Sequence, residues 1–230
     1  YISMLEACAQ IILLDEGKKI HTAIIDNGLE LDLVIQTSLI YMYSKCGSIE
    51  DAEHVFANIS SVDVVSFGTM IAGYALNSHG DEACFLFEQM QLGGLCPDQA
   101  TFVGVLKACG LSGALEGGRY VHGLILQSRF AHDKVIGNAL IDMYAKWGRL
   151  QDARYSFDKL LSRSLASWNA MMTGYAQFDD SSQTLLLFQR LQYEGLHPDQ
   201  VSFVCALKAC SNAGSIEHGR QIHDQVIRHS

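Results

Sequence analysis

The stretch KVIGNALIDMYAKWGRLQDARYSFDKL, residues 134–160, decides the fold class of this chain. Apolar residues recur at helical spacing on both sides of Gly148, which interrupts the pattern. Nothing in the pattern indicates a β-strand. The stretch therefore predicts two short helices joined by a tight turn at the glycine.

The two-helix pattern repeats along the chain. MYSKCG begins at Met42, and MYAKWG begins at Met143, 101 residues later. The same step separates LEAC at Leu5 from LKAC at Leu106, and that segment from LKAC at Leu207. About a third of all positions are identical at this offset, which indicates internal repetition rather than chance.

Shorter units lie within the long period. Each ends in a polar residue just before an apolar helical stretch: Asp32, Asp63, Asp98, Asp133, Ser164 and Asp199. These residues predict complete units at 33–63, 64–98, 99–133, 134–164 and 165–199, with partial units at 1–32 and 200–230. One helix pair cannot bury both of its apolar faces, so neighbouring pairs must stack. We therefore predict an all-α solenoid with a concave surface.

Turn and cap residues also indicate where helices end. Gly47 is predicted to close the first helix of unit 33–63, and Ser48 with Asp51 is predicted to form a capping box that opens the second. Pro97 and Pro198 end two of the longer units, because proline cannot continue a helix.

Composition limits the classes of function. Apolar residues make up 49% of the 230 residues and charged residues 18%, which excludes a disordered tail. No apolar run is long enough for a membrane span, and the seven cysteines show no CxxC pair, which favours reduced thiols in an intracellular compartment. The chain begins at Tyr1 without a leader pattern, so we expect any targeting segment to lie outside it.

The sequence offers no catalytic or metal-binding constellation. His218 and His223 are five residues apart, as are Cys205 and Cys210, so neither pair shares a helix face as ligands four apart would. The chain has no HxE segment followed by PCxxC, which is the zinc-deaminase signature. We expect no enzyme activity, no metal and no cofactor.

The repeat resembles a known family. VVSFGTMIAGYA from Val64 and LASWNAMMTGYA from Leu165 resemble the start of a P motif of plant-type pentatricopeptide repeat proteins, and CPD and HPD resemble its end. Residues 134–160 resemble the S motif, and LKACGLSGALEGGRYVHGLIL from Leu106 resembles the L motif. The order L, S, P, L, S, P, L covers all 230 residues and resembles the PLS subclass. The resemblance implies a right-handed α-solenoid of helix-turn-helix repeats that binds single-stranded RNA.

The resemblance also assigns roles to positions within each repeat. It places base selection on the fifth and last residues: Thr37 with Asp63, Gly68 with Asp98, Val103 with Asp133, Asn138 with Ser164, and Asn169 with Asp199. It places packing against the base faces on the second residues: Val34, Val65, Ala100, Val135, Ala166 and Val201. Lys45 and Lys146 match a family lysine near the end of the first helix, where each could neutralise a phosphate.

Hydrogen-bonding capacity gives a physical reason for such a code. An ionised Asp only accepts, so it suits guanine and uracil, whose ring nitrogens carry a proton, whereas Ser can donate to the bare ring nitrogen of cytosine or adenine. In the family, Thr or Ser at the fifth position goes with purines and Asn with pyrimidines. Gly68 and Val103 have no group that could select a base. Family repeats run parallel to RNA, so the predicted target is 5′-GNNCU-3′.

Each of these residues also has an explanation that needs no RNA. Asp and Ser are preferred helix N-caps, the valines could pack between repeats, and lysines suit helix C-termini. Thr37, Asn138 and Asn169 are stronger candidates, because they lie in an otherwise apolar first turn. The net charge of −9 opposes nucleic-acid binding unless the charges are segregated, and it predicts a shallow salt dependence.

We therefore expect a non-catalytic array that recognises single-stranded RNA, from a mitochondrial or chloroplast RNA-editing (C-to-U) or RNA-processing factor. In the family, the editing chemistry often belongs to a deaminase-like domain outside such arrays. The alternative is a protein-interaction scaffold, because family L motifs bind small editing-cofactor proteins. The partial units at the two ends also allow end-to-end self-association.

Overall fold

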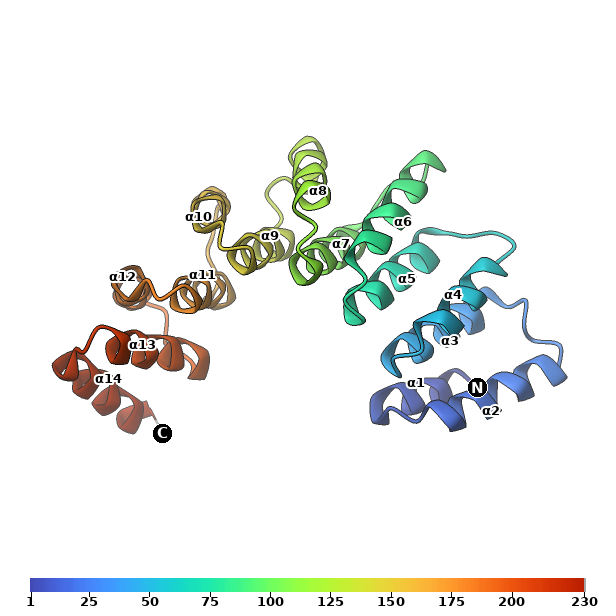
Figure 1. The fold of residues 1–230 in the computed structure, drawn as a ribbon, viewed down its shortest axis with the longest axis horizontal. Helices are drawn as coiled ribbons and strands as arrows, with labels where there is room; N and C mark the ends of the chain where they lie inside the picture. The colour runs from blue at the N-terminus through green and yellow to red at the C-terminus, as the bar shows by residue number, and fades with distance from the viewer. Residues whose placement is uncertain (230) are drawn as a thin grey trace. The chain divides into compact units, whose positions relative to one another are not determined.

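A computed structural model describes the backbone of residues 1–229 and the side chains of residues 1–228, and these residues form helices and no strand (Figure 1). The helices divide into two compact units, residues 1–125 and the residues from 126 onward. The predicted all-α solenoid class is thereby confirmed. In the described part of the chain, no helix has both the length and the apolar character needed to cross a bilayer.

The first unit is built from helix pairs. Its helices are α1 (Ile2–Ile11), α2 (Leu14–Asp26), α3 (Leu33–Lys45), α4 (Ile49–Ala57), α5 (Val64–Leu76), α6 (Gly80–Leu92), α7 (Gln99–Ser112) and α8 (Leu115–Gln127), which ends just past the division. The first helices of the pairs, α1, α3, α5 and α7, pack side by side in chain order. Helices α2, α4 and α6 each pack on the first helix of their own pair. The first helices thus form a continuous layer that the second helices cover.

The second unit repeats this arrangement. Its helices are α9 (Lys134–Lys146), α10 (Leu150–Lys159), α11 (Leu165–Gln177), α12 (Ser181–Tyr193), α13 (Gln200–Asn212) and α14 (Ile216–His229). Here α9, α11 and α13 are in contact in chain order, and α10, α12 and α14 each pack on the helix before them.

Glycine turns close α3 and α9, as the sequence predicts, but one predicted cap is wrong. Gly47 and Gly148 adopt left-handed φ angles of 78° and 69°, which cost glycine little. Ser48 precedes α4 without capping it: its hydroxyl donates to Asp51 Oδ2 at 2.6 Å. That carboxylate also binds Lys18 Nζ of α2 at 2.9 Å, and the backbone N–H of Ser48 donates to the carbonyl oxygen of Tyr43 at 2.9 Å, so the reciprocal bond of a capping box does not form.

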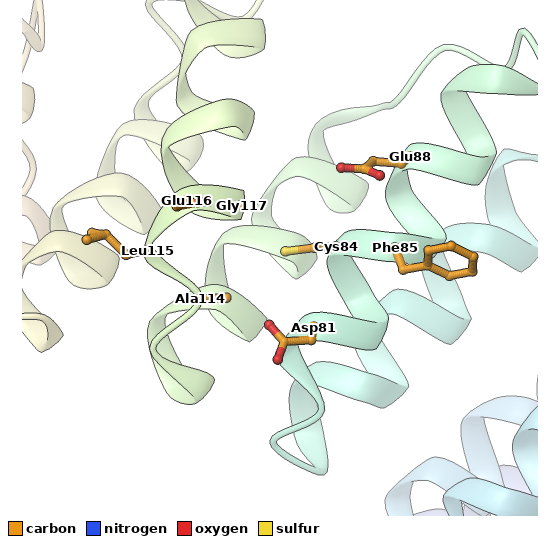
Figure 2. Close-up of a pocket in the computed structure, with 8 residues that line it drawn as sticks. All are labelled: Asp81, Cys84, Phe85, Glu88, Ala114, Leu115, Glu116 and Gly117. Atoms are coloured by element: carbon orange, nitrogen blue, oxygen red, sulfur yellow. The ribbon is translucent and has the colours of Figure 1, made fainter.

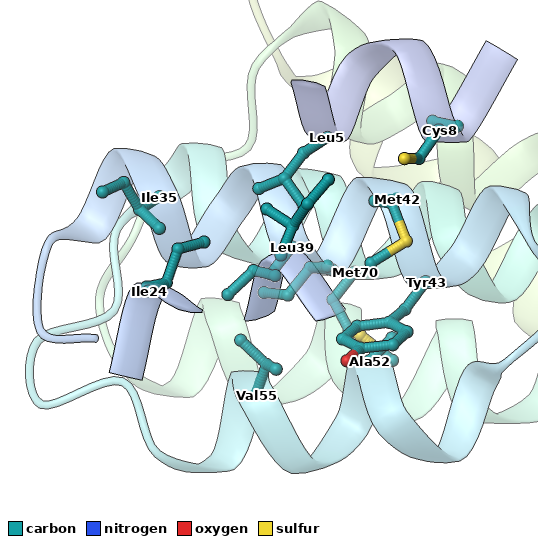
Figure 3. Close-up of a cluster of buried hydrophobic side chains, with 13 residues drawn as sticks. Leu5, Cys8, Ile24, Ile35, Leu39, Met42, Tyr43, Ala52, Val55 and Met70 are labelled. Carbon is teal, nitrogen blue, oxygen red and sulfur yellow. The ribbon is translucent and has the colours of Figure 1, made fainter. Parts of the chain in front are cut away.

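The core of the first unit begins between its first two helix pairs (Figure 3). Leu5, Ile24 and Leu39 come from three different helices and are almost completely buried. Ala52 on α4 is fully buried as well, and its small side chain lets α4 approach α3 closely. Burying each large aliphatic side chain contributes about 1.5–3 kcal/mol relative to leaving it exposed.

The aromatic contact in the second unit provides a test of this packing. Phe157 and Trp168 are fully buried, with ring centroids 4.8 Å apart. The substitution Phe157→Ala should lower the free energy of unfolding by ~3–5 kcal/mol, because it removes buried area and leaves a cavity. The control Tyr155→Ala changes a 53% exposed ring on the same helix and should cost less than about 1 kcal/mol. Urea unfolding measures both variants. Similar losses of unfolding free energy for Phe157→Ala and Tyr155→Ala would contradict the assignment of Phe157 to the core.

Candidate nucleic-acid interface

The six predicted terminal residues all cap the first helix of the following pair. In each case a backbone N–H group two or three residues on donates to the capping side chain: Asp32, Asp63, Asp98, Asp133, Ser164 and Asp199. The distance from the third N atom to the capping oxygen lies between 2.8 and 3.4 Å. The capping explanation therefore holds at all six positions, and any role in base selection is additional to it.

A capping carboxylate can still accept a hydrogen bond from elsewhere. Asp63 uses Oδ1 for the N–H of Ser66, at 2.8 Å. Asp98 uses Oδ1 for both the N–H and the hydroxyl of Thr101, at 2.8 and 2.7 Å. Among the described residues, Oδ2 of Asp63 and Oδ2 of Asp98 have no hydrogen-bond partner. Each of these carboxylates therefore keeps an oxygen for an external donor.

Capping and recognition can be separated by substitution at Asp63. Asp63→Ala should lower the free energy of unfolding by ~1 kcal/mol, because the N–H of Ser66 loses its acceptor. Asp63→Asn keeps an acceptor for the cap and should leave stability nearly unchanged, although it replaces the second oxygen with a donor. Chemical denaturation measures the free energy of unfolding of both variants. If Asp63→Asn loses as much stability as Asp63→Ala, an amide cannot replace the carboxylate as the cap.

The fifth and last residues of unit 165–199 are directly bonded to each other. Asn169 Nδ2 on α11 donates to Oδ1 and Oδ2 of Asp199, at 3.0 and 2.9 Å. Asn169 Oδ1 accepts from the hydroxyl of Ser202 on α13 at 2.7 Å. These bonds fix both the position and the orientation of the Asn169 amide across two neighbouring first helices.

The same network changes the acidity of Asp199. Partial burial raises the pKa of this carboxyl, but hydrogen bonds from the Ser202 backbone and from the side chains of Asn169 and Ser202 outweigh that effect and hold the pKa below its ordinary value of 3.8. A carboxyl with a lowered folded-state pKa stabilises the fold above its unfolded pKa. That contribution is lost as the pH falls through the folded pKa.

Stability measured against pH tests the Asp199 network. Between about pH 5 and pH 2, the unsubstituted chain should lose more stability than Asp199→Asn, which keeps an N-cap acceptor but carries no titrating group. Above about pH 5 the difference between the two should be constant. Thermal unfolding across this range measures the effect. If the curves of stability against pH are parallel for the two chains, Asp199 has the same pKa in the folded and unfolded states, which would contradict the prediction.

The other fifth residues are held differently. The Thr37 hydroxyl donates within its own helix to the carbonyl oxygens of Leu33 and Val34, at 3.0 and 2.9 Å, and no hydrogen bond in the described chain joins it to Asp63. Asn138 Oδ1 is buried and has no hydrogen-bond partner among the described residues. Leaving a buried acceptor unsatisfied costs about 1–3 kcal/mol, which an external donor would relieve.

The second residues remain at the surface although they are apolar. Val34, Val65, Val135 and Val201 are 46–61% exposed, and the alanines at equivalent positions, Ala100 and Ala166, are exposed as well. The residue that follows each of these six is buried. Packing between repeats therefore does not account for the second residues. Instead, each of the helices α3, α5, α7, α9, α11 and α13 carries an exposed apolar side chain near its start.

A pocket in the first unit brings together four of the predicted positions. It has a volume of about 280 Å³ and lies between α3, α5 and the start of α7. Its lining includes Val65, Gly68 and Asp98, the second, fifth and last residues of unit 64–98. Ala100, the second residue of the next unit, also lines it. A side chain at Gly68 would occupy this region and approach Thr101 Oγ1 to 3.3 Å.

The two predicted phosphate ligands differ in their surroundings. Lys45 is exposed and forms no ion pair within the described residues; its Nζ lies 5.7 Å from the ring centroid of Tyr41. Tyr41 lines the pocket at Gly68. Lys146 Nζ instead binds Asp142 Oδ2 at 2.7 Å, so its charge is already compensated. Lys45 is therefore the better placed of the two for an external anion.

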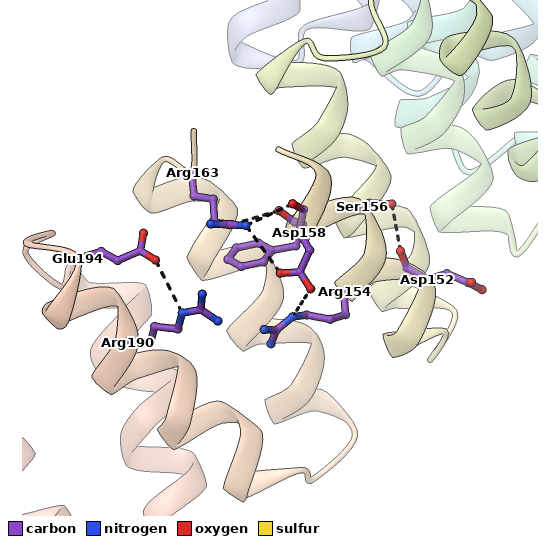
Figure 4. Close-up of polar contacts among 8 residues, drawn as sticks. Asp152, Arg154, Ser156, Asp158, Arg163, Arg190 and Glu194 are labelled. Carbon is purple, nitrogen blue, oxygen red and sulfur yellow. Dashed lines mark hydrogen bonds and ion pairs between the residues drawn. The ribbon is translucent and has the colours of Figure 1, made fainter. Parts of the chain in front are cut away.

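Much of the charge in the second unit is paired on its second helices (Figure 4). Arg154 Nε on α10 lies 3.0 Å from Asp158 Oδ2, and Arg163 lies 3.7 Å from the other oxygen of that carboxylate. Arg190 and Glu194 form a further pair at 3.7 Å at the end of α12. These exposed pairs stabilise the fold little.

Sequence reasoning missed two residues of this interface. Ser202, which holds the Asn169 amide, is the third residue of its unit, and Ser66, Thr101 and Ser167 recur at that position. This recurrence was the signal that could have identified it. Tyr41 gave no signal, because its place beside the Gly68 pocket depends on contact between two repeats.

Comparison with protein families identifies the class of this chain. A family model described as PPR repeat family matches residues 62–110, and one described as PPR repeat matches residues 37–61, 138–165 and 166–196. Together they cover more than half of the chain. The chain belongs to the pentatricopeptide repeat family.

Its relatives include long proteins of Arabidopsis thaliana. Pentatricopeptide repeat-containing protein At2g33680 is 37% identical over 218 residues, which are 95% of this chain and 30% of that protein. At1g11290, named chloroplastic, is 37% identical over 96% of this chain and 27% of its own length. At2g03380, named mitochondrial, is 36% identical over 99% of this chain and 33% of its own length. The chain thus spans a third or less of these relatives.

Solved structures with the same fold include that of the maize pentatricopeptide repeat protein PPR10. It has a TM-score of 0.78 at 20% identity, over 99% of this chain and 34% of that one. PPR10 in complex with an 18-nt psaJ RNA element has a TM-score of 0.81 at 18% identity, over 100% of this chain and 35% of that one. At such identities the likeness concerns the fold.

Proposed function

We propose that this chain binds single-stranded RNA selectively, with one base at each complete repeat. The observation that carries the proposal is the exposure of the apolar second residues, which keep contact with solvent beside buried neighbours. Bases need an apolar surface for their faces and polar groups for their edges, and the first helices offer both. The RNA complex of PPR10, a protein with the same fold, supports this proposal.

The pocket in unit 64–98 suggests how one base is held. A base between Val65 and Ala100 would contact apolar groups on both faces. Its edge would meet Asp98, whose Oδ2 has no partner among the described residues. Gly68 offers no side-chain group to that edge, so we expect this repeat to accept any base.

The proposed target remains 5′-GNNCU-3′. To bind cytosine, the Asn138 side chain would have to turn its buried, unsatisfied Oδ1 toward the amino group of the base, and the hydroxyl of Ser164 can donate to the ring nitrogen of that base. Asn169 and Asp199 form the last site, which we assign to uracil. For Thr37 and Asp63 we propose guanine, although the Thr37 hydroxyl must turn from its own helix to donate to the base.

We further propose that the chain is the recognition part of an organelle RNA-editing or RNA-processing factor. The chloroplastic and mitochondrial names of its relatives support an organelle but do not choose between the two. Each stacked base contributes roughly 1–3 kcal/mol before ordering costs, so five repeats bind modestly. Longer relatives can add repeats and thereby affinity.

Titration of the chain with fluorescently labelled RNA tests the proposal. An oligonucleotide that contains GNNCU should bind about tenfold or more tightly than a scrambled one at the same stated salt concentration. The affinity should fall only slightly with added salt, because few phosphates are contacted. Equal affinities for both sequences would leave nonspecific contact or a protein-binding scaffold as the function.

The substitution Asn169→Thr tests a single site. It removes the amide that pairs with Asp199, and it should shift the preference at the final base from uracil toward guanine. Asn58→Thr, at the C-terminal end of the second helix α4, is the matched control and should leave the preference unchanged. Retention of uracil preference in Asn169→Thr would remove this residue from the base-selecting set.

A further inference from the structure

Two thiols from neighbouring repeats lie in contact within the first unit. Cys84 on α6 and Cys109 on α7 have Sγ atoms 3.1 Å apart. Cys109 is fully buried, whereas Cys84 is half-buried and lines a pocket of about 410 Å³ between α6 and the start of α8 (Figure 2). The proposed RNA interface uses neither residue.

The start of α8 packs closely against Cys84, which also lines the pocket. Figure 2 shows this sulfur directed from α6 toward the segment that contains Gly117. A Cβ atom at Gly117 would lie 2.6 Å from Cys84 Sγ and would collide with it. Glycine at this position therefore allows α8 to approach Cys84 closely, and Cys84 is the one of the two thiols that lines the pocket.

The two thiols differ in acidity. The hydrogen bond between Cys84 and Cys109 lowers the pKa of Cys84, against the opposing effects of burial and of the nearby carboxylates Asp81 and Glu88. The pKa of Cys109 is raised, because its proton is shared with Cys84 and because it is buried. Because Cys84 is half-buried and lines the pocket whereas Cys109 is fully buried, Cys84 is the thiol that an oxidant can reach, and Cys109 is the resolving thiol.

The charge of the pocket limits which oxidants can reach Cys84. Asp81, Glu88 and Glu116 all line it. These carboxylates repel anionic oxidants such as oxidised glutathione, and they do not repel neutral hydrogen peroxide.

We propose that Cys84 and Cys109 form an oxidation site that closes to a disulfide between two neighbouring repeats, with hydrogen peroxide as the oxidant. The Cys84 thiolate attacks one peroxide oxygen, the O–O bond breaks, and the leaving hydroxide takes up the released proton as water. The Cys109 sulfur then attacks the Cys84 sulfenic acid. An S–S bond forms, the S–O bond breaks, and a second water leaves with the Cys109 proton. The two thiols lose two electrons, and one peroxide is reduced to two waters.

The disulfide would join α6 to α7 covalently. Helix α7 is capped by Asp98 and contains Ala100, and both residues line the Gly68 pocket. Moving the sulfurs from 3.1 Å to a bonding distance of about 2.0 Å needs only small side-chain movements. Oxidation would therefore fix the packing of these two repeats without rearranging either helix.

Peroxide treatment of the folded, unsubstituted chain tests the site directly. After alkylation of the remaining thiols and proteolysis, mass spectrometry should find one linked peptide pair that contains Cys84 and Cys109 and separates on reduction. Oxidised glutathione at the same concentration should form this link more slowly. Sulfinic acid or a glutathione adduct at Cys84 without the link would overturn the proposal.

Two variants provide controls for the assignment. Cys96→Ser changes an exposed cysteine in the segment between α6 and α7 and should leave the link intact. Cys84→Ser should abolish it and leave Cys109 as a free thiol. If Cys109 still forms a disulfide in Cys84→Ser, its partner is another cysteine, and the proposed pair is wrong. Circular dichroism before and after oxidation should show unchanged helix content, which separates this chemistry from oxidation of unfolded chain.

Discussion

The capped start of each first helix is the interaction on which the rest of the structure depends. The last residue of one repeat accepts N–H groups at the start of the next repeat's first helix, at all six junctions. Each cap contributes about 1 kcal/mol and fixes where one repeat follows another. It also places a polar group beside an exposed apolar second residue. Under the proposed function, stability and recognition therefore share one side chain.

The fifth residues differ from one another in how their side chains are held. Asn169 already has partners in Asp199 and Ser202, so its amide is oriented before any ligand arrives. Asn138 has a buried oxygen without a partner among the described residues, and Thr37 bonds its own backbone. A ligand would gain most from the unsatisfied site and would need the least rearrangement at the preorganised one.

Local patterns predicted the elements, and contacts between distant residues decided the details. Gly148 and the 101-residue period were sufficient for the helix pairs, because turns and helical periodicity are local properties. The capping box predicted at Ser48 was wrong: the N–H of Ser48 donates to the carbonyl oxygen of Tyr43, and Asp51 binds the Ser48 hydroxyl and Lys18 of α2. The Cys84–Cys109 contact likewise depends on how α6 meets α7, which residue spacing does not indicate. The exposure of the second valines also required the structure.

Methyl NMR spectroscopy of the chain during titration with GNNCU RNA tests most directly whether bases stack on the second residues. We predict large shifts for the methyl groups of Val34, Val65, Val135 and Val201. The similarly exposed Leu186 of α12 and the more exposed Leu92 of α6 lie on second helices and should shift little. Saturable RNA binding that leaves the four valines unchanged, or that shifts the leucines instead, would contradict the first-helix interface.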